Sequence, residues 1–205
     1  AAVPPSPTKE GGTTAADGPA RPAGGTQRSS YLPVNGSVSM QNRDSGSYEV
    51  ASFSGGPFWD LEAAFRRVEG VVSTAAGYSG GTMEEPSYAD VSSGESGHAE
   101  TVIVGFDPAV VTYRDLLEVF FAAHDPTGRA YGETGPGGQY RPVIWYHAPA
   151  QETAAKAFCA ELRDRGLYDA PFPATVEPAR AFWPAEEHHQ QYYEKLAAYF
   201  GVRRQ

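Results

Sequence analysis

The stretch that decides the fold is residues 48–70, which reads YEVASFSGGPFWDLEAAFRRVEG. Its beginning, residues 48–53, is rich in strand-forming side chains, and a glycine pair follows soon after. The apolar residues after the glycines recur at helical spacing, which predicts a helix over residues 59–68. Pro57 suits the first position of this helix, since its missing N–H has no helical partner to lose, and Gly70 ends it. The stretch therefore predicts a strand, a tight turn and a helix.

Strands and helices alternate along the rest of the chain. We expect strands at residues 71–78, 100–106, 143–146 and 174–177, helices at 113–123, 151–165 and 187–200, and glycine-rich loops at 79–97 and 129–138. Such alternation favours helices layered on a sheet over a strand sandwich or a helical bundle.

The beginning of the chain differs from the rest in composition. Residues 1–46 are rich in Ala, Pro, Gly, Ser and Thr and contain few large apolar side chains. Such a segment cannot bury enough apolar surface to offset the entropy that it would lose on ordering. We therefore expect a disordered or loosely packed arm over residues 1–46 and one folded domain over residues 47–205.

Composition and charge exclude several classes of partner. The net charge is −9, from 25 acidic and 16 basic residues, which argues against binding to nucleic acid or to an anionic membrane. No apolar run reaches the roughly 18 residues that a membrane span needs. The chain shows no signal peptide, so we expect a cytoplasmic protein, and an export signal removed ahead of Ala1 stays open as an alternative. The sequence does not indicate an oligomeric state.

The chain has one cysteine, Cys159. A disulfide within the chain and a redox cycle between two of its own thiols are therefore excluded. Cys159 follows Phe158 within the expected helix at 151–165, a position that favours a small buried apolar residue over a reactive thiol.

A series of short motifs runs through the domain in a fixed order. They are Gly55-Gly56-Pro57-Phe58-Trp59, Gly77-Tyr78-Ser79-Gly80-Gly81, Gly97-His98-Ala99-Glu100, Phe106-Asp107-Pro108, His124-Asp125-Pro126-Thr127, Gln139-Tyr140-Arg141 and Pro184-Ala185-Glu186. Each motif is a weak signal alone, but the ordered set resembles the A-type peptide methionine sulfoxide reductases over about residues 48–195. The resemblance implies an α+β fold of the ferredoxin-like kind, a mixed sheet covered by helices in two layers.

The resemblance also implies a reaction. In this family a cysteine at a helix start attacks the sulfoxide sulfur, an acid protonates the departing oxygen, and a second thiol resolves the oxidised cysteine. Pro57 stands at the position of that cysteine, and proline has no nucleophile. Gly135 stands where the family's pocket loop carries an aspartate, and residues 201–205 lack the cysteines that the family often carries in its tail. The family's own reduction is therefore not expected to run through this chain.

The catalytic residues that the resemblance leaves in place are Glu100, Tyr88 and Tyr140. Glu100 matches the acid that protonates the sulfoxide oxygen, and the two tyrosines match the phenols that hydrogen-bond to it. A carboxyl group beside aromatic walls is expected to have a raised pKa. Alone, each residue would be an ordinary solvated carboxylate or half-buried tyrosine, and the matched motifs favour the pocket instead.

Substrate-binding positions follow from the same resemblance. Phe58 and Trp59 match the aromatic wall around the substrate methyl group, although plain core packing is the alternative. Pro57 and Gly135 complete the expected lining. No cofactor and no metal are expected, because the resemblance makes the candidate ligands structural; they are His98, His124, His188 and His189.

Three functions stay open on the sequence. The favoured one is a repurposed, non-redox enzyme that uses Glu100, Tyr88 and Tyr140 for acid–base chemistry on a small polar substrate, and an enzyme of specialised metabolism would fit this description. The second is a catalytically dead pseudoenzyme that binds methionine sulfoxide or a similar small ligand. The third and least favoured is a peptide methionine sulfoxide reductase that works through Cys159.

Overall fold

The structure is a computed structural model, and it describes residues 48–127, 138–166, 168 and 174–201. The arm expected over residues 1–46 lies outside the described residues, as does most of the loop expected at 129–138.

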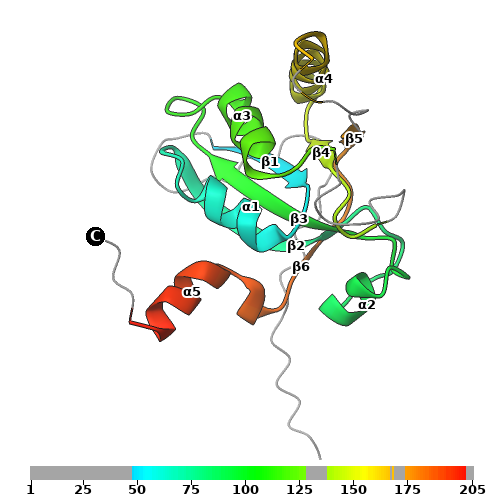
Figure 1. Ribbon diagram of the computed structural model, residues 1–205, viewed down its shortest axis with the longest axis vertical. Helices are drawn as coiled ribbons and strands as arrows, with labels where there is room; N and C mark the ends of the chain where they lie inside the picture. Colours follow the sequence, from blue (N-terminus) through cyan, green and yellow to red (C-terminus); the bar gives the residue numbers. More distant parts are fainter. Residues whose placement is uncertain (1–47, 128–137, 167, 169–173, 202–205) are drawn as a thin grey trace, which may run out of the picture.

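A six-stranded mixed sheet forms the centre of the domain, with the strand order β5-β4-β1-β3-β2-β6 (Figure 1). The strands are β1 (Glu49–Ser54), β2 (Val71–Ser79), β3 (Ala99–Phe106), β4 (Val143–Tyr146), β5 (Thr175–Pro178) and β6 (Phe182–Pro184). Neighbouring strands are antiparallel except for the parallel pair β4 and β5. The inner strands and two helices follow the β–α–β–β–α–β connection of ferredoxin-like folds, so the expected α+β, ferredoxin-like fold is confirmed.

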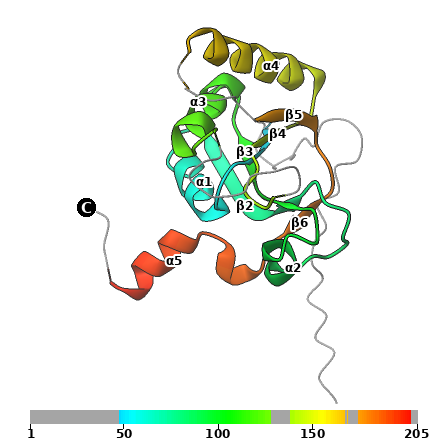
Figure 2. The ribbon, with the colours of Figure 1, turned by 45° about the vertical axis from the view of Figure 1, so that its right-hand side comes forward.

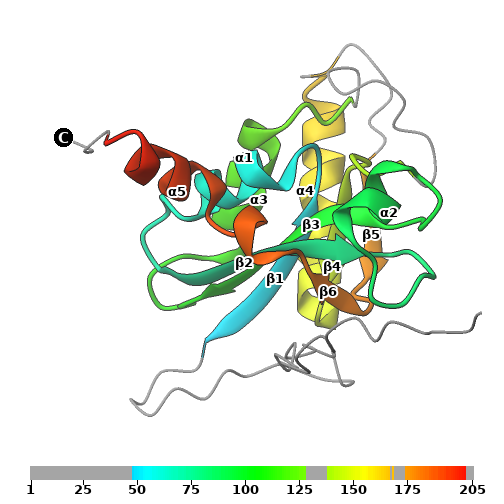
Figure 3. The same ribbon diagram turned by 90° about the horizontal axis from the view of Figure 1, so that it is seen from below.

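The helices are not distributed equally over the two sides of the sheet. They are α1 (Phe58–Phe65), α2 (Tyr88–Ser92), α3 (Tyr113–Ala123), α4 (Pro149–Asp164) and α5 (Tyr192–Tyr199). Helices α1 and α3 lie on the same side of the sheet (Figure 3), and α4 packs on α3 and on the β4–β5 edge. None of the described helices is both long and apolar enough to cross a bilayer.

An aromatic layer fixes α1 and α3 on the sheet. Phe53 of β1 stacks on Phe65 of α1 and on Phe120 of α3, with ring centroids 5.0 and 5.1 Å apart. On α1 the fully buried side chains are Phe58, Leu61 and Phe65, which recur at three- and four-residue spacing. Burying side chains of this size contributes about 1.5–3 kcal/mol each, so the start of α1 is held firmly over the sheet.

The beginning and the end of α1 differ from the prediction. Pro57 precedes the helix as its N-cap, with an extended ψ of 127°, and is not the first helical residue. The helix ends at Phe65 and does not continue to Val68, because Arg67 and Val68 donate to carbonyls only three residues back. These bonds tighten the last turn into a 3₁₀-like geometry.

Two elements, α2 and β6, are not predicted by the sequence analysis. The signal for α2 is present, since Ser87 and Asp90 form a capping box at its start within the expected glycine-rich loop. The single helix expected over 187–200 is also wrong. A 3₁₀ turn at Glu187–His189 comes first, and the left-handed Gln191, with φ of 50°, separates it from α5.

Helix α5 lies beside α1 and leads away from the sheet (Figures 1 and 2). The guanidinium of Arg66 forms a two-pronged ion pair with Glu194 at 2.9 Å, and the Tyr193 hydroxyl donates to Asp60 over 2.7 Å. These contacts hold the first turn of α5 against both the first turn and the end of α1.

Candidate active site

The turn before α1 is joined to the loop before β4. Gly56 has a left-handed φ of 83°, which suits glycine because a side chain would be strained there. Its N–H donates to the carbonyl of Tyr140 over 3.2 Å, which ties the turn to the loop before β4. Pro57 is half-buried at the N-cap and offers no nucleophilic atom, no N–H and no proton to transfer. The turn and the helix start are therefore both formed, but the residue at position 57 has no sulfur atom that could attack a substrate.

Glu100 lies directly beside this helix start. It is the second residue of β3, is only 2% exposed, and its Oε2 accepts the main-chain N–H of Phe58 over 2.9 Å. Burial raises the pKa of Glu100 to about 7, and the hydrogen bond from Phe58 opposes the rise. The carboxyl group is thus partly protonated at neutral pH, as a general acid requires.

Phe58 and Trp59 lie within an aromatic cluster. The Phe58 ring is fully buried, with centroids 5.9 Å from Trp59, 5.9 Å from Tyr78 and 6.5 Å from Tyr88. Trp59 is partly buried and stacks on Tyr192 at 4.3 Å. Such a cluster can cradle an apolar group such as a methyl.

Tyr88 and Tyr140 come from different parts of the chain and interact electrostatically with each other. Tyr88 opens α2 and is half-buried. Burial raises its pKa, and the neighbouring Glu100 and Tyr140 raise it further. The Tyr88 phenol therefore remains a protonated donor near neutral pH, close enough to the Glu100 carboxyl to interact with it electrostatically.

The remaining expected position, Gly135, lies outside the described residues. Cys159 belongs to α4 and is 2% exposed in the core. Burial raises the pKa of its thiol, so it lacks the features of a reactive cysteine. Among the described residues, no cluster of three or more His, Cys, Asp or Glu side chains could hold a metal ion.

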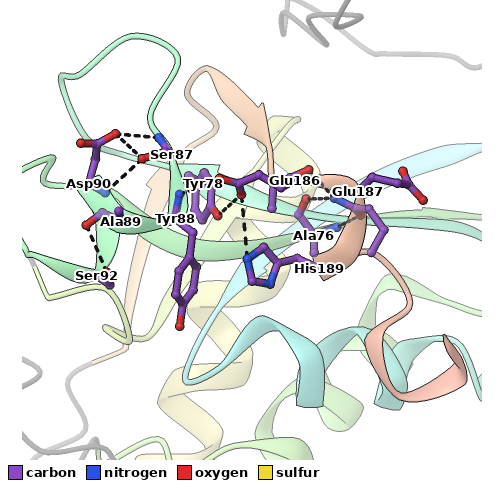
Figure 4. A network of polar contacts seen from close by, with 12 residues as sticks. Ala76, Tyr78, Ser87, Tyr88, Ala89, Asp90, Ser92, Glu186, Glu187 and His189 are labelled. Carbon is purple, nitrogen blue, oxygen red and sulfur yellow. Dashed lines mark hydrogen bonds and ion pairs between the residues drawn. The ribbon is translucent and has the colours of Figure 1, made fainter. Parts of the chain in front are cut away.

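A polar network that the sequence did not predict lies beside the aromatic cluster (Figure 4). The Tyr78 hydroxyl donates to Glu186 over 2.9 Å, and the Tyr88 N–H donates to the other carboxylate oxygen over 2.9 Å. Tyr78 faces Glu100 across the β2–β3 pair, so the network reaches the candidate acid. His189 joins it, because its Nε2 lies 4.0 Å from Glu186 Oε2, and its Nδ1 accepts the indole N–H of Trp59 over 3.2 Å. The only sequence signal was the motif that contains Glu186, which by itself assigns no role.

The site is similar to a known family in sequence. The family model for peptide methionine sulfoxide reductase matches residues 49–203. A peptide methionine sulfoxide reductase MsrA of Methanoculleus marisnigri is 50% identical over 151 residues, which cover 73% of this chain and 91% of the relative. The MsrA of Geobacter sulfurreducens is 51% identical over 151 residues, with 73% and 92% covered.

Solved structures agree with the sequence relatives. The reduced form of Mxr1 from Saccharomyces cerevisiae has a TM-score of 0.62 and 29% identity, over 72% of this chain and 85% of that one. Methionine sulfoxide reductase A of Corynebacterium diphtheriae has a TM-score of 0.62 and 30% identity, over 80% and 82% of the two chains.

These relatives contradict the expectation of a repurposed non-redox enzyme or a dead pseudoenzyme. Proteins that are half identical to the chain over nearly their whole length are named as reductases. The expectation gave too much weight to Pro57 and the missing tail cysteines. Sulfoxide reduction also needs a binding site and a proton donor, and the loss of a thiol from one position does not remove these. Similarity of this extent makes the chain a member of the peptide methionine sulfoxide reductase family.

Proposed function

We propose that the chain reduces methionine sulfoxide in peptides and that a dithiol co-substrate supplies the sulfur nucleophile. The observation that carries the proposal is the Glu100 carboxyl, buried at the start of α1 with a pKa of about 7. A sulfoxide is a poor electrophile until its oxygen is protonated, and a buried, partly protonated acid supplies that proton near neutral pH. The names of the relatives support the substrate class.

The proposed substrate pose follows from the surrounding side chains. The methyl group of methionine sulfoxide packs on Phe58 and Trp59, whose rings make the apolar part of the cluster. The sulfoxide oxygen points to Glu100 and accepts hydrogen bonds from the phenols of Tyr88 and Tyr140. Burial raises the pKa of the Tyr88 phenol, so it donates without losing its proton.

The reaction balances with one dithiol. Glu100 gives its proton to the sulfoxide oxygen while a co-substrate thiolate attacks the sulfur, so an S–S bond forms and the S–O bond breaks. The second thiol then attacks the co-substrate sulfur, which forms the disulfide and releases methionine. The two protons of the dithiol leave in one molecule of water, the methionine sulfur gains two electrons, and Glu100 is reprotonated.

Cys159 is not the nucleophile in this proposal. Its side chain lies in the core on α4, and its burial favours the neutral thiol over the thiolate. A thiol from solution has no such penalty. Because that thiol is not held in the site, the rate should rise in proportion to its concentration.

The test is turnover of a synthetic peptide that contains methionine sulfoxide, with dithiothreitol as the dithiol and methionine quantified by mass spectrometry. We expect reduction above the rate of dithiothreitol alone, restricted to one sulfoxide diastereomer because the site is chiral. Cys159→Ser should keep this rate, and Glu100→Gln should lose most of it. A rate equal to that of dithiothreitol alone at every concentration would overturn the proposal.

A further inference from the structure

Arg141 directly follows Tyr140 and has no role in the proposed reaction. Its side chain is half-buried, and burial lowers the pKa of the guanidinium. An arginine keeps its charge in proteins, so the chain holds a partly desolvated cation here. The two side-chain hydrogen bonds that this cation makes within the described residues go to main-chain carbonyls and not to a carboxylate.

The two carbonyls belong to the parts of the chain that carry the two phenols. Nη2 of Arg141 donates over 3.0 Å to Gly97, near the end of the β2–β3 connection (residues 80–98), which contains Tyr88. Nη1 donates over 3.1 Å to Gly138 in the loop before β4 (residues 138–142), which contains Tyr140. A guanidinium is a rigid planar fork, so the two carbonyls that it binds are held at a fixed separation.

A third glycine brings the guanidinium against the other end of the β2–β3 connection. Gly80 is the first residue of that connection and has a left-handed φ of 87°. A Cβ atom on Gly80 would lie 2.7 Å from Nη2 of Arg141, which is too close for any contact. The guanidinium therefore occupies the space that the missing side chain leaves, and it contacts both ends of the connection that carries Tyr88.

The loop before β4 is also held to the candidate acid by its main chain. The carbonyl of Gln139 accepts the N–H of Glu100 over 2.8 Å, and the carbonyl of Tyr140 accepts the N–H of Gly56 over 3.2 Å. These bonds fix two neighbouring peptide units beside the acid and beside the turn before α1. The guanidinium adds the link from this loop to the β2–β3 connection.

We propose that Arg141 is a positioning residue for the phenols of Tyr88 and Tyr140. Its guanidinium joins the β2–β3 connection to the loop before β4 and so sets the two phenols at the spacing that one sulfoxide oxygen needs. The role toward the substrate rests on the proposed function. Two donors stabilise a developing charge on one oxygen only if both reach it, and a misplacement of about 1 Å can cost about 10²-fold in rate.

The first test needs no substrate and follows amide hydrogen exchange by NMR of ¹⁵N-labelled protein. Arg141→Met keeps much of the side-chain volume but removes every donor. We expect the amides of Gly56 and Glu100 to exchange at least about tenfold faster in this variant, because their acceptors lie in the loop that is released. The amide of Val104, within β3, is the internal reference and should keep its exchange rate.

The second test separates positioning from a general structural role. With the methionine sulfoxide peptide and dithiothreitol, Arg141→Met should lower kcat by about 10- to 100-fold and change KM by less than about threefold. In the Tyr140→Phe background the same substitution should lower kcat by less than about threefold, because the hydroxyl that Arg141 places is already absent. A residue that only stabilises the fold would cost the same factor in both backgrounds.

Two further variants test the fork and the charge separately. Arg141→Lys keeps the charge, but one ammonium group cannot hold two carbonyls in a planar fork, so it should lose most of what Arg141→Met loses. It also carries the test if the methionine variant does not fold. Arg180→Met is the matched control, since Arg180 is exposed and acts on Arg141 only through its charge, and it should keep the wild-type kcat.

The outcomes separate the two proposals. Equal losses of kcat in the wild-type and Tyr140→Phe backgrounds, or a wild-type kcat in Arg141→Lys, would overturn the positioning role while the reductase proposal stands. Unchanged exchange at Gly56 and Glu100 in Arg141→Met would show that the guanidinium does not hold the loop, and would overturn it as well. If the wild-type chain gives no turnover above that of dithiothreitol alone, the reductase proposal fails, and the exchange test still decides whether Arg141 joins the two parts of the chain.

Discussion

The main-chain N–H of Phe58 donates to Oε2 of Glu100 over 2.9 Å and so joins the first residue of α1 to the second residue of β3. The bond satisfies one of the free N–H groups at the helix start and fixes the acid beside position 57. Aromatic packing of α1 on the sheet holds the helix side of this pair. The register of β3, with Glu100 opposite Tyr78, holds the strand side. The acid is therefore placed by the core of the fold and not by a loop.

Glu100→Gln should lower the reductase rate by about 10²–10⁴-fold, the usual contribution of general acid catalysis. Glutamine keeps the acceptor for Phe58 N–H, so the shape of the site is preserved. The pH profile tests the assignment. The wild-type rate should level off above about pH 7, where Glu100 loses its proton while the thiolate fraction still rises. The rate of the variant should not level off near pH 7 but should rise with the thiolate fraction of the dithiol. A pH profile equal to that of the wild type would contradict the role of Glu100.

The same substitution should stabilise the protein at alkaline pH. The pKa of Glu100 is about 7 in the folded chain against 4.5 when free, so the folded state binds its proton more tightly. Below about pH 4.5 Glu100 is protonated in both the folded and the unfolded state, so its ionisation does not lower the free energy of unfolding. Above pH 7 the folded state must hold a buried charge, which lowers the free energy of unfolding. That loss is on the order of 3 kcal/mol, or roughly 6–12 °C in Tm for a domain of this size. Thermal melts at pH 5 and pH 8 measure it.

The matched control for the stability prediction is the exposed Glu69→Gln. We expect its melting temperature to follow that of the wild type at both pH values. Glu100→Gln should match the wild type at low pH and melt higher at pH 8. Equal melting temperatures of all three proteins at pH 8 would show that Glu100 is not destabilising when ionised.

Much of the fold follows from the sequence because its signals are local. The apolar spacing of α1 and α3 and the β-prone runs of β1 and β3 predict these elements within a few residues. The short helix α2 was not predicted, because it lies in a glycine-rich segment whose composition indicates a loop despite the capping box at its start. The break at Gln191 was missed for a different reason. Its left-handed backbone is held by contacts from distant residues, such as Glu62, which accepts the Gln191 N–H over 2.7 Å.

The candidate site was predictable only in part. Glu100, Tyr88, Phe58 and Trp59 follow from family resemblance, and the structure brings their elements together. The contact of His189 with the site could not be derived, because the residue that donates to its imidazole, Trp59, lies 130 positions away in sequence. Pairings of this kind are set by the sheet and helix packing and leave no local pattern.

Tyr88→Phe should lower kcat by about 10- to 100-fold, somewhat below the loss seen when a full oxyanion-hole donor is removed. The phenol has no described role in holding the fold, since Glu186 binds the main chain of Tyr88 and not its hydroxyl. The melting temperature should therefore stay close to that of the wild type. Tyr199→Phe, at a tyrosine that is 84% exposed on α5, is the control and should leave kcat unchanged. An equal kcat for both variants would remove Tyr88 from the proposed oxygen contacts.

A chain that starts at Ser47 should fold with the melting temperature of the full chain. We propose this because residues 1–46 have a composition that cannot form a core, and the family model begins matching at residue 49. The comparison uses thermal melts and the reductase rate of both chains. A clearly lower melting temperature of the shortened chain would show that the arm packs on the domain.

Pro57→Cys should raise the reductase rate with dithiothreitol by at least about 100-fold, because a thiol held in the site replaces one that must arrive from solution. It also restores a backbone N–H at the helix start, where the helix dipole favours a thiolate.

A second experiment on Pro57→Cys, without any dithiol, tests whether the introduced thiol is the nucleophile. The introduced thiol can reduce one sulfoxide by taking its oxygen as a sulfenic acid, so we expect one methionine per chain and then no further turnover. No second cysteine lies in a position to resolve that sulfenic acid, because Cys159 is buried on α4. The wild type and Pro57→Ser should give no such burst. A variant with no burst and no gain in rate would show that the helix start cannot present a nucleophile to the sulfoxide, and that the site beside Glu100 is not built for attack from position 57.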